Sequence, residues 1–333
     1  MSEFRLNRAT KEWIIIATER AKRPQQFLGK SEKPKLPPFD PHCPFCPGNE
    51  KQTPSEIYAL RQRNTVPDQP GWRVRVVTNK YPALEPAEKM VKITGKFFRS
   101  ALGVGKHEVI IETPRHNQTF AILNLKQAEE VCLVCWKRYL FLEKDRRFKL
   151  IMIFKNHGVT AGTSLKHPHI QVIALPLIPA SIRHPLEEAM SYYDDHGTCV
   201  FCDMMQEEFK AKKRIILENE KYVAFHPFAS RSPFETWIVP KRHNACFGSI
   251  TEGEVKSMAS VLRRVLRKIH DRLGDPDYNL IIRTAPIKDT LEDYYHWYVQ
   301  ILPRLTTPAG FELGSGVYIN TSLPEETAKF MRR

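Results

Sequence analysis

The sequence passes through the same order of motifs twice, and this repetition constrains the fold more than any other feature. In each half a Cys-x-x-Cys pair precedes a strand-like run that ends at a histidine, and a long amphipathic stretch and a second histidine follow. A glutamate lies eight residues before the first histidine in both halves, as Glu108–His116 and Glu235–His243. A further 51 residues lead to His167, and 53 lead to His296. Such self-similarity at a fixed spacing indicates a duplicated structural unit.

Local patterns support two copies of one α+β unit. In the first copy, strand-like runs at 73–77 and 107–112 precede a helical pattern at 125–144 and a strand at 149–154. The second copy repeats this order with strand-like, helical and strand-like runs at 234–239, 252–273 and 278–282. We expect a linker near 180–196 between the two copies.

The stretch from Asn156 to Gln171 carries the most chemistry. Its front, Asn-His-Gly-Val-Thr-Ala-Gly-Thr-Ser, is small and glycine-rich, which suits backbone N–H groups that surround a phosphate. Its end places His167 and His169 on the same side of an extended segment, because side chains alternate faces along a strand. Such a strand presents a metal ligand and a nucleophile side by side.

Six of the seven cysteines fall in three Cys-x-x-Cys pairs, which in a cytoplasmic chain indicates metal binding before disulfides. The pairs that begin at Cys43 and Cys199 lie in turn-like segments. The third, Cys132 and Cys135, lies within a helical pattern, where free thiols pack as small hydrophobic groups.

Each half therefore combines two thiolates with two histidines, a closed Cys₂His₂ set typical of structural Zn²⁺. We expect two Zn²⁺ ions per chain, one bound by Cys43, Cys46, His116 and His167 and one by Cys199, Cys202, His243 and His296. His42 and His107 are alternative ligands for the first site, although neither has a counterpart in the second half.

With His167 assigned to metal, His169 is a free imidazole beside the glycine-rich loop. A neutral imidazole whose second nitrogen is held by a backbone carbonyl can attack phosphorus. In the second half Tyr298 stands at the corresponding position, and the loop at 285–293 has three carboxylates, which repel a phosphate, and no glycine. We therefore expect one catalytic centre, in the first half.

The net charge of +14 and a pI near 9.4 indicate an anionic partner, which could be a phosphorylated small molecule, a nucleic acid or a membrane. A membrane is not expected, because no apolar stretch approaches the ~18 residues of a membrane-spanning helix. The start of the chain has no apolar run behind a basic segment, so we expect a cytoplasmic protein.

These motifs resemble the galactose-1-phosphate uridylyltransferase family of the histidine triad superfamily. The resemblance covers nearly the whole chain and rests on Arg20-Ala21-Lys22-Arg23-Pro24, Cys43-x-x-Cys46, Asn79, Asn156, Gly162-x-Ser164, His167-Pro168-His169-x-Gln171 and Gly310-Phe311-Glu312. It implies an α+β fold of two tandem histidine-triad-like half-barrel repeats, each an antiparallel sheet with flanking helices. The catalytic half would span 1–180 and the degenerate half 197–333, each with a zinc site.

The resemblance also implies a role for each matching residue. His169 would take up a nucleoside monophosphate, assisted by Gln171, and Asn79 would contact the ribose. The phosphate contacts would come from Asn156, Gly162, Ser164 and Gln171, and the sugar phosphate would be held by Arg20 and Arg23, whose guanidinium groups suit bidentate contacts. The family works as homodimers, in which Glu312 would reach the hexose in the partner's site.

The implied reaction moves a nucleoside monophosphate between a nucleoside diphosphate hexose and a hexose 1-phosphate, as in the UDP-glucose-dependent uridylyl transfer of galactose metabolism. The segment 313–320 lacks the lysine, tyrosine and glutamine of typical galactose-specific members. The second Cys-x-x-Cys pair also differs from the carboxylate-and-histidine iron site of many members. Both features resemble the ADP-glucose phosphorylase branch, which would transfer an adenylyl group to inorganic phosphate.

Two other functions are compatible with parts of the sequence. Histidine triad hydrolases usually carry a third histidine where this chain has Gln171, and a neutral amide there favours transfer over activation of water. A zinc-bearing nucleic-acid binder would suit the positive charge and the basic, aromatic segments 137–139 and 146–149. It would not explain why one half alone keeps His169 and a glycine-rich loop, so nucleic acid is not expected as the partner.

Overall fold

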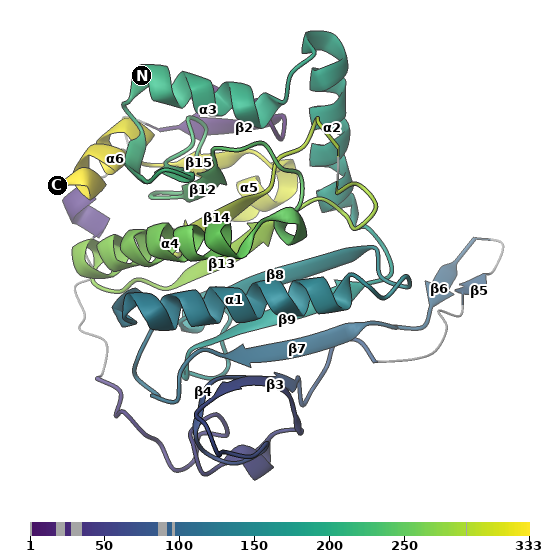
Figure 1. Ribbon diagram of the computed structural model, residues 1–333. Helices are drawn as coiled ribbons and strands as arrows, with labels where there is room; N and C mark the ends of the chain where they lie inside the picture. Colours follow the sequence, from purple (N-terminus) through teal and green to yellow (C-terminus); the bar gives the residue numbers. More distant parts are fainter. Residues whose placement is uncertain (1, 18–23, 28–34, 86–91, 95–96, 291) are drawn as a thin grey trace.

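The computed structural model describes residues 2–17, 24–27, 35–85, 92–94, 97–290 and 292–333, and its centre is a ten-stranded antiparallel sheet (Figure 1). One side of the sheet runs in the order β3 (Glu56–Arg61), β4 (Trp72–Thr78), β7 (Lys106–Ile111), β9 (His169–Leu175) and β8 (Leu150–His157). It continues through β13 (Tyr278–Arg283), β14 (Tyr298–Pro303), β12 (Thr236–Pro240), β11 (Tyr222–Phe225) and β10 (Ile215–Glu218). The two halves of the chain therefore share one sheet and meet where β8 pairs with β13.

Two long helices, α1 (Leu125–Leu142) and α4 (Glu252–Leu273), pack against each other and cover one face of this sheet (Figure 1). Both begin at a capping box, Asn124 with Gln127 and Thr251 with Glu254, which satisfies backbone donors of the first turn. Their apolar faces join the largest core cluster, which burial of apolar area stabilises.

Alternation along the strands divides the first half of the sheet into two faces. Val76, Ile110 and Ile170 belong to the core beneath α1 and α4, whereas their neighbours Val77 and Val109 belong to a smaller cluster on the opposite face. This opposite face is the one that carries the candidate site.

In the second half the same opposite face is covered by α2 (Ala180–His196) and α3 (Val200–Ala211). The linker expected near 180–196 is thus a helix, because its apolar residues Leu186 and Ala189 are buried against this half and Gly197, at φ +70°, ends it. The sequence pattern missed it because Pro185 interrupts the segment.

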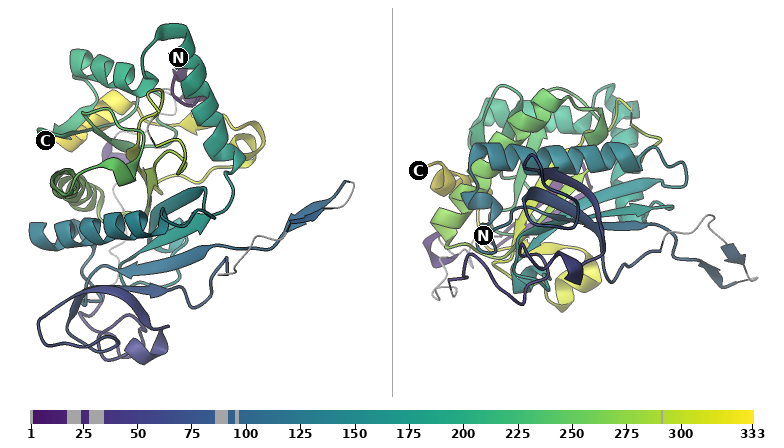
Figure 2. Two further views of the ribbon diagram at one scale, coloured as in Figure 1. Left: turned by 45° about the vertical axis from the view of Figure 1, so that its right-hand side comes forward. Right: turned by 60° about the horizontal axis from the view of Figure 1, so that its bottom comes forward.

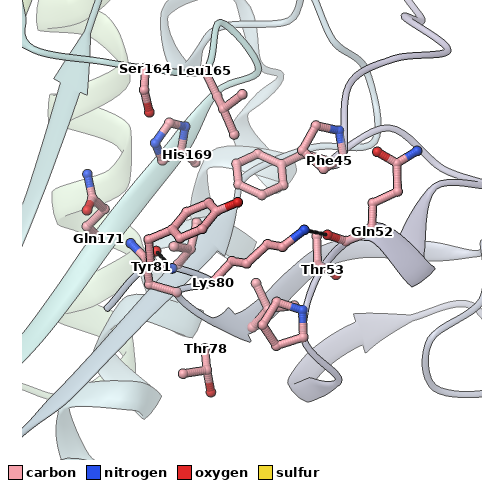
Figure 3. A pocket seen from close by; sticks show the side chains of 15 residues that line it. Phe45, Gln52, Thr53, Thr78, Lys80, Tyr81, Ser164, Leu165, His169 and Gln171 are labelled. Atoms are coloured by element: carbon pink, nitrogen blue, oxygen red, sulfur yellow. Dashed lines mark hydrogen bonds between the residues drawn. The ribbon is translucent and has the colours of Figure 1, made fainter. Parts of the chain in front are cut away.

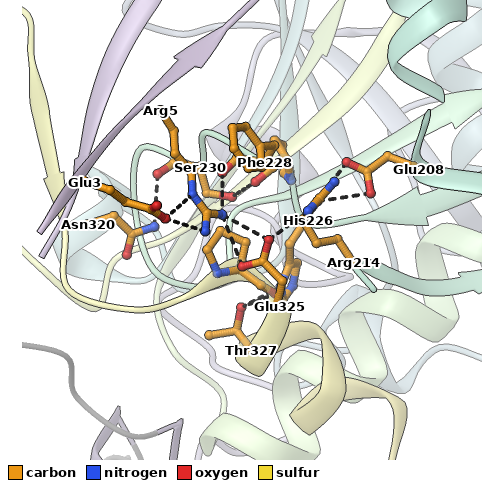
Figure 4. Close-up of polar contacts among 12 residues, drawn as sticks. Glu3, Arg5, Glu208, Arg214, His226, Phe228, Ser230, Asn320, Glu325 and Thr327 are labelled. Carbon is orange, nitrogen blue, oxygen red and sulfur yellow. Dashed lines mark hydrogen bonds and ion pairs between the residues drawn. The ribbon is translucent and has the colours of Figure 1, made fainter. Parts of the chain in front are cut away.

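The first strands and the last helix of the chain both lie against the second half. A small sheet joins β1 (Glu3–Asn7), β2 (Glu12–Ile16) and β15 (Tyr318–Asn320), and α5 (Gly310–Ser315) and α6 (Pro324–Arg332) flank β15 in sequence. The carboxylate of Glu325 on α6 accepts hydrogen bonds from Arg5 at 3.0 Å and from Arg214 at 2.7 Å (Figure 4). These contacts fasten the first strand to the last helix.

A hairpin arm, β5 (Lys92–Thr94) and β6 (Arg99–Ala101), extends away from the body of the protein (Figure 2). The α+β class and the antiparallel sheets predicted from the sequence are confirmed. Cys132 and Cys135 are buried thiols of α1, as predicted. None of the described helices is long and apolar enough to cross a membrane.

Candidate functional site

A cavity of about 450 Å³ opens on the uncovered face of the first half, above β4, β7 and β9 (Figure 3). The strand register explains its floor, since Gln171 lies opposite Val109 and Val109 opposite Val77, so that all three point to the same side. The walls come from the Cys-x-x-Cys segment through Phe45, from the turn after β4 through Asn79, Lys80 and Tyr81, and from the glycine-rich stretch through Ser164.

His169 begins β9 and lines this cavity. Its Nδ1 donates a hydrogen bond to the carbonyl oxygen of His167 at 2.8 Å, so its Nε2 keeps a free lone pair in the neutral ring. Burial lowers the pKa of His169 below its ordinary value and outweighs that hydrogen bond, which acts in the opposite direction. The edge-to-face contact with Phe45, at 5.4 Å between ring centroids, helps to hold the ring in place. His169 is therefore a neutral, oriented imidazole whose Nε2 is available at the cavity.

Gln171 lies next to His169 on the cavity side of β9 (Figure 3). Its Oε1 is 2.8 Å from Nε2 of His107, a buried residue of β7. The alternative of His107 as a zinc ligand is therefore wrong, because alternation along β7 places its ring beside Gln171 and Asn79. The same alternation, applied together with the β7–β9 register, could have revealed this neighbour of the site.

The glycine-rich loop does not offer its backbone in the way that the sequence predicts. The N–H of Thr160 donates to Asp277, and the N–H groups of residues 161–163 donate to carbonyls at Gly158 and Val159. Gly158 and Gly162 adopt φ of +87° and +89°, which permits this compact turn. The N–H groups of residues 160–163 are thus satisfied within the protein, and Ser164 is the residue of this loop segment that lines the cavity together with Leu165.

Four potential metal ligands converge beside the cavity, namely Cys43, Cys46, His116 and His167, all buried and with ligand atoms within 4.8 Å of one another. Sγ of Cys46 lies 3.7 Å from Nδ1 of His116 and 3.6 Å from Nδ1 of His167. A tetrahedral Zn²⁺ with bonds of about 2.3 Å to sulfur and about 2.0 Å to nitrogen requires about 3.6 Å between such atoms. Nε2 of His167 donates to the carbonyl of Thr113 at 2.8 Å, which leaves Nδ1 for the metal.

The protonation of this cluster also suits a cation. Burial raises the pKa of the Cys43 thiol to about 11, so a thiolate there requires a neighbouring positive charge. Burial lowers the pKa of His167 to about 4, which keeps its imidazole neutral and able to ligate. These residues fit a structural Zn²⁺.

The family model described as "Galactose-1-phosphate uridyl transferase, N-terminal domain" matches residues 1–179, and the corresponding C-terminal domain matches residues 186–314. The chain belongs to the galactose-1-phosphate uridylyltransferase family. It is therefore a nucleotidyltransferase.

Curated relatives match over almost the whole chain. ADP-glucose phosphorylase of Arabidopsis thaliana is 36% identical over 99% of this chain and 92% of that protein. Galactose-1-phosphate uridylyltransferase of Thermotoga maritima is 30% identical over 100% of this chain and 98% of that protein. Among solved structures, an ADP-glucose phosphorylase from Arabidopsis thaliana with bound ADP-glucose has a TM-score of 0.83 at 32% identity, covering 100% of this chain and 98% of that one.

The second ligand set of this uridylyltransferase-family chain is less complete than the first. Cys199, Cys202 and His243 form a group, with Sγ of Cys202 at 3.3 Å from Nδ1 of His243. A hydrogen bond from Cys202 lowers the pKa of Cys199 to about 5, so this set includes a thiolate. The ring of His296 lies near that of His243, at 5.3 Å between centroids, but its Nδ1 faces the carbonyl of Trp297 at 2.9 Å. The structure thus groups three of the four expected ligands.

Tyr298, which the sequence spacing aligns with His169, lies in a buried aromatic stack. Tyr298 stacks on Trp237 at 4.3 Å between centroids, and both are buried. The amide of Gln300 accepts from Arg283 at 3.0 Å and donates to Glu235 at 2.7 Å. An aromatic stack and an internal polar network therefore surround the two residues that the sequence spacing aligns with His169 and Gln171.

The remaining residues expected at the site fall in different places. Arg20 and Arg23 lie outside the described residues. Glu312 caps its own helix, α5, by accepting the N–H of Ala309 at 3.0 Å, and it is not among the residues that line the cavity of its own chain. Lys80, which no sequence motif indicated, adds a cation to the cavity wall; its place directly after Asn79 in the chain was the signal that could have revealed it.

Proposed function

We propose that this chain transfers a nucleoside monophosphate between a nucleoside diphosphate hexose and a phosphate-bearing acceptor through a covalent nucleotidyl-His169 intermediate. The first candidate reaction is exchange between UDP-glucose and a hexose 1-phosphate, as the names of the uridylyltransferase relatives suggest. The observation that carries the proposal is the imidazole of His169, which is neutral, fixed through Nδ1 and adjacent to a cavity of nucleotide size.

In the first half-reaction, the Nε2 lone pair of His169 attacks the α-phosphorus of the donor. The N–P bond forms while the bond between the α-phosphorus and the bridging oxygen breaks, and the electron pair leaves with the hexose 1-phosphate. The Nδ1 proton stays in its hydrogen bond to the His167 carbonyl, which stabilises positive charge on the ring. The acceptor phosphate then attacks the same phosphorus and restores the free imidazole.

The cavity supplies groups suited to the charge that develops on the phosphoryl oxygens. Gln171 and Ser164 lie beside His169, and Lys80 adds a positive charge to the opposite wall. Asn156 follows two residues after Phe154, the partner of Gln171 on β8, so we place its side chain on the same face as His169. Gly162, whose missing Cβ leaves space near Asn156, would allow a phosphate to approach this amide.

The other assigned groups would act around this centre. Asn79 would contact the ribose, Arg20 and Arg23 the phosphate of the leaving hexose 1-phosphate, and Glu312 the hexose in the partner chain of a homodimer. Expulsion of a dianionic sugar phosphate requires cationic partners, which is the physical reason to assign the two guanidinium groups.

We also propose a cytoplasmic location.

The two ligand sets would each hold one Zn²⁺, the first through Cys43, Cys46, His116 and His167 and the second through Cys199, Cys202, His243 and His296. A closed four-ligand Zn²⁺ contributes to folding and brings no water to the reaction. His167 lies two residues before His169, so the first set would fix the start of β9 and hence the nucleophile.

The order of the strands supports a division into two repeats, at 1–180 and 197–333. The order β3, β4, β7, β9, β8 from the outer edge matches β10, β11, β12, β14, β13 from the other edge. In each run the strand that carries the His-x-x-x-Gln spacing lies fourth. We infer that each run is a histidine-triad-like half-barrel and that the second has become a scaffold.

A second candidate is phosphorolysis of ADP-glucose, with inorganic phosphate as the acceptor. It is favoured by the 36% identity to ADP-glucose phosphorylase over 99% of this chain and by the similarity to that enzyme's structure with bound ADP-glucose. The chemistry at His169 is the same for both candidates, so only the base and the acceptor differ.

Crossing UDP-glucose, UDP-galactose and ADP-glucose with hexose 1-phosphate and inorganic phosphate distinguishes the candidates. The correct donor alone should leave radiolabelled nucleotide on the protein, in an alkali-stable and acid-labile form, and initial rates should be ping-pong. His169→Asn should abolish labelling, whereas Tyr298→Phe, at the matched position of the second half, should label normally. Labelling of the His169→Asn protein contradicts the proposal, and nucleotide release without any acceptor would indicate a hydrolase.

A further inference from the structure

Gln171 lines the cavity and strand alternation places Asn156 on the same face, and the oxygen of each amide is held by a residue that is not among those lining the cavity. A carboxamide carries an acceptor at one end and two donor hydrogens at the other. Only the donor end stabilises a phosphoryl oxygen, while the acceptor end repels it. The function of Gln171 and Asn156 therefore depends on which end is turned to the cavity.

The orientation of Gln171 is determined by the tautomer of His107. The backbone N–H of Ala83 is an obligatory donor, and it lies 3.2 Å from Nδ1 of His107. This nitrogen must accept, so the hydrogen of the neutral ring is on Nε2, 2.8 Å from Gln171. Gln171 must then accept through Oε1, which leaves its NH₂ group for the cavity.

Asn79 does not compete for this hydrogen. Its Nδ2 is 3.1 Å from Nε2 of His107, but its Oδ1 accepts the backbone N–H of Tyr81 at 2.9 Å. The amide nitrogen of Asn79 is thus also a donor, and two donors do not form a hydrogen bond. The 2.8 Å contact to Gln171 is the one that the His107 hydrogen makes.

The orientation of Asn156 is determined from the second half of the chain. Nε of Arg304 is an obligatory donor and lies 2.6 Å from Oδ1 of Asn279. Nδ2 of Asn279 is 2.9 Å from the carbonyl of Ala161, an obligatory acceptor, and 2.8 Å from Oδ1 of Asn156. Both ends of Asn279 are therefore assigned independently, and they require Asn156 to accept. The NH₂ group of Asn156 is left facing Gly162.

We propose that His107 and Asn279 are positioning residues for nucleotidyl transfer, which set Gln171 and Asn156 as donors to the transferred phosphoryl group. The inference rests on the proposed function of His169. It also gives the second half a part in the reaction, because Asn279 lies on β13 and Arg304 directly follows β14. Asn279 can act directly on Asn156, because the two residues are paired where β8 meets β13.

The test measures single-turnover labelling of the zinc-bound full-length protein with whichever nucleoside diphosphate hexose labels the wild type. His107→Ala should slow labelling by about 10- to 100-fold, less than the about 100- to 1,000-fold expected when a donor itself is removed. In a Gln171→Ala background the same His107→Ala change should alter the rate by less than about twofold, because the group it orients is gone. His107→Gln should restore much of the rate, since its amide can donate near the position of Nε2.

The second arm uses Asn279→Asp, which keeps the size of the side chain and removes its donor. Asn156 would have to turn its NH₂ group toward the carboxylate, so its oxygen would face the phosphoryl group. Labelling should slow by about 10- to 100-fold in the wild-type background and by less than about twofold with Asn156→Ala. His226→Ala, which removes another buried imidazole away from the cavity, is the matched control and should label at the wild-type rate.

The outcomes separate this inference from the function on which it rests. A wild type that takes no label from any donor overturns the function, whereas normal labelling of both His107→Ala and Asn279→Asp overturns the positioning roles alone. Equal losses in the presence and absence of the partner amide would indicate general damage and also overturn them. If His107→Ala does not fold, judged by its zinc content and urea midpoint, His107→Gln and the Asn279→Asp arm decide the question.

Discussion

The buried ion pair of Lys155 and Glu112 provides a quantitative test of how the catalytic strand is supported. Lys155 on β8 hydrogen-bonds Glu112, and their side chains are 2% and 0% exposed. Nζ of Lys155 also lies 3.5 Å from the carbonyl oxygen of His169, so the pair lies beside the backbone of the proposed nucleophile. Replacing Lys155 with methionine keeps the apolar length of the side chain and leaves Glu112 buried without its cation.

The expected loss follows from the burial of both groups. Two charges about 4 Å apart attract by about 4 kcal/mol at an effective dielectric constant of 20, and removing one partner of a buried pair typically costs about 3–5 kcal/mol. A chain of 333 residues has an unfolding entropy of about 0.7 kcal/mol/K at its melting temperature. Lys155→Met should therefore lower Tm by about 4–7 °C.

The double variant Lys155→Met/Glu112→Met separates the ion pair from packing. Replacing a buried pair by apolar groups of similar volume is often neutral or stabilising, so the double variant should be more stable than Lys155→Met by about 2 kcal/mol or more. Urea unfolding of the zinc-bound protein, followed by tryptophan fluorescence, measures each free energy. Lys144→Met, at an exposed lysine, is the control and should change stability by less than about 0.5 kcal/mol. Costs that add in the double variant, or a neutral Lys155→Met, would refute the reasoning.

Three further predictions concern the metal, the loop and a buried histidine. Cys43→Ser should reduce the zinc content from two ions to one per chain by metal analysis, while Cys132→Ser keeps two; two ions in Cys43→Ser would contradict the first ligand set. Gly158→Ala should destabilise the protein and slow labelling, because the new Cβ would lie 1.8 Å from Oδ1 of Asp277. The control Gly197→Ala meets no atom within 4 Å and should cost only about 1 kcal/mol of backbone strain. Equal urea midpoints for the two variants would contradict this prediction. Burial lowers the pKa of His226 to about 3, despite the nearby carboxylate of Glu325, so between pH 6.5 and 3 the unfolded chain binds a proton that the folded chain excludes. The free energy of unfolding should accordingly fall as the pH is lowered. In urea titrations His226→Gln should reduce the fall between pH 7 and pH 5 by about 2 kcal/mol. The same pH dependence of the unfolding free energy in the wild type and the variant would contradict the prediction.

Much of the site in the first half of the chain could be predicted, because its determinants are local or periodic. The alternation of a strand places His167, His169 and Gln171 on one side, and the structure puts His169 and Gln171 at the cavity. The paired Cys-x-x-Cys spacing predicted the first ligand group in full and three residues of the second. The predicted duplication rests on residues of the same type that recur at nearly equal separations.

The glycine-rich loop shows where composition alone misleads. Small residues and glycines are equally compatible with a turn that surrounds an anion and with one that satisfies its own N–H groups. The choice was made by Asp277, more than a hundred residues away, which accepts the N–H of Thr160 at 2.8 Å. The predicted use of the backbone therefore failed although the glycine positions were correct.

The sequence by itself determined which residues share a strand face and which cysteines and histidines have ligand spacing, and it predicts two related halves. Only the tertiary structure decided which side chains meet across strands, as His107 does with Gln171 and Asn279 with Asn156. The physical reason is that periodicity specifies the direction of a side chain relative to its own backbone. Its partner depends on strand register and on the junction of β8 with β13, which join residues 64 and 123 positions apart in these two contacts.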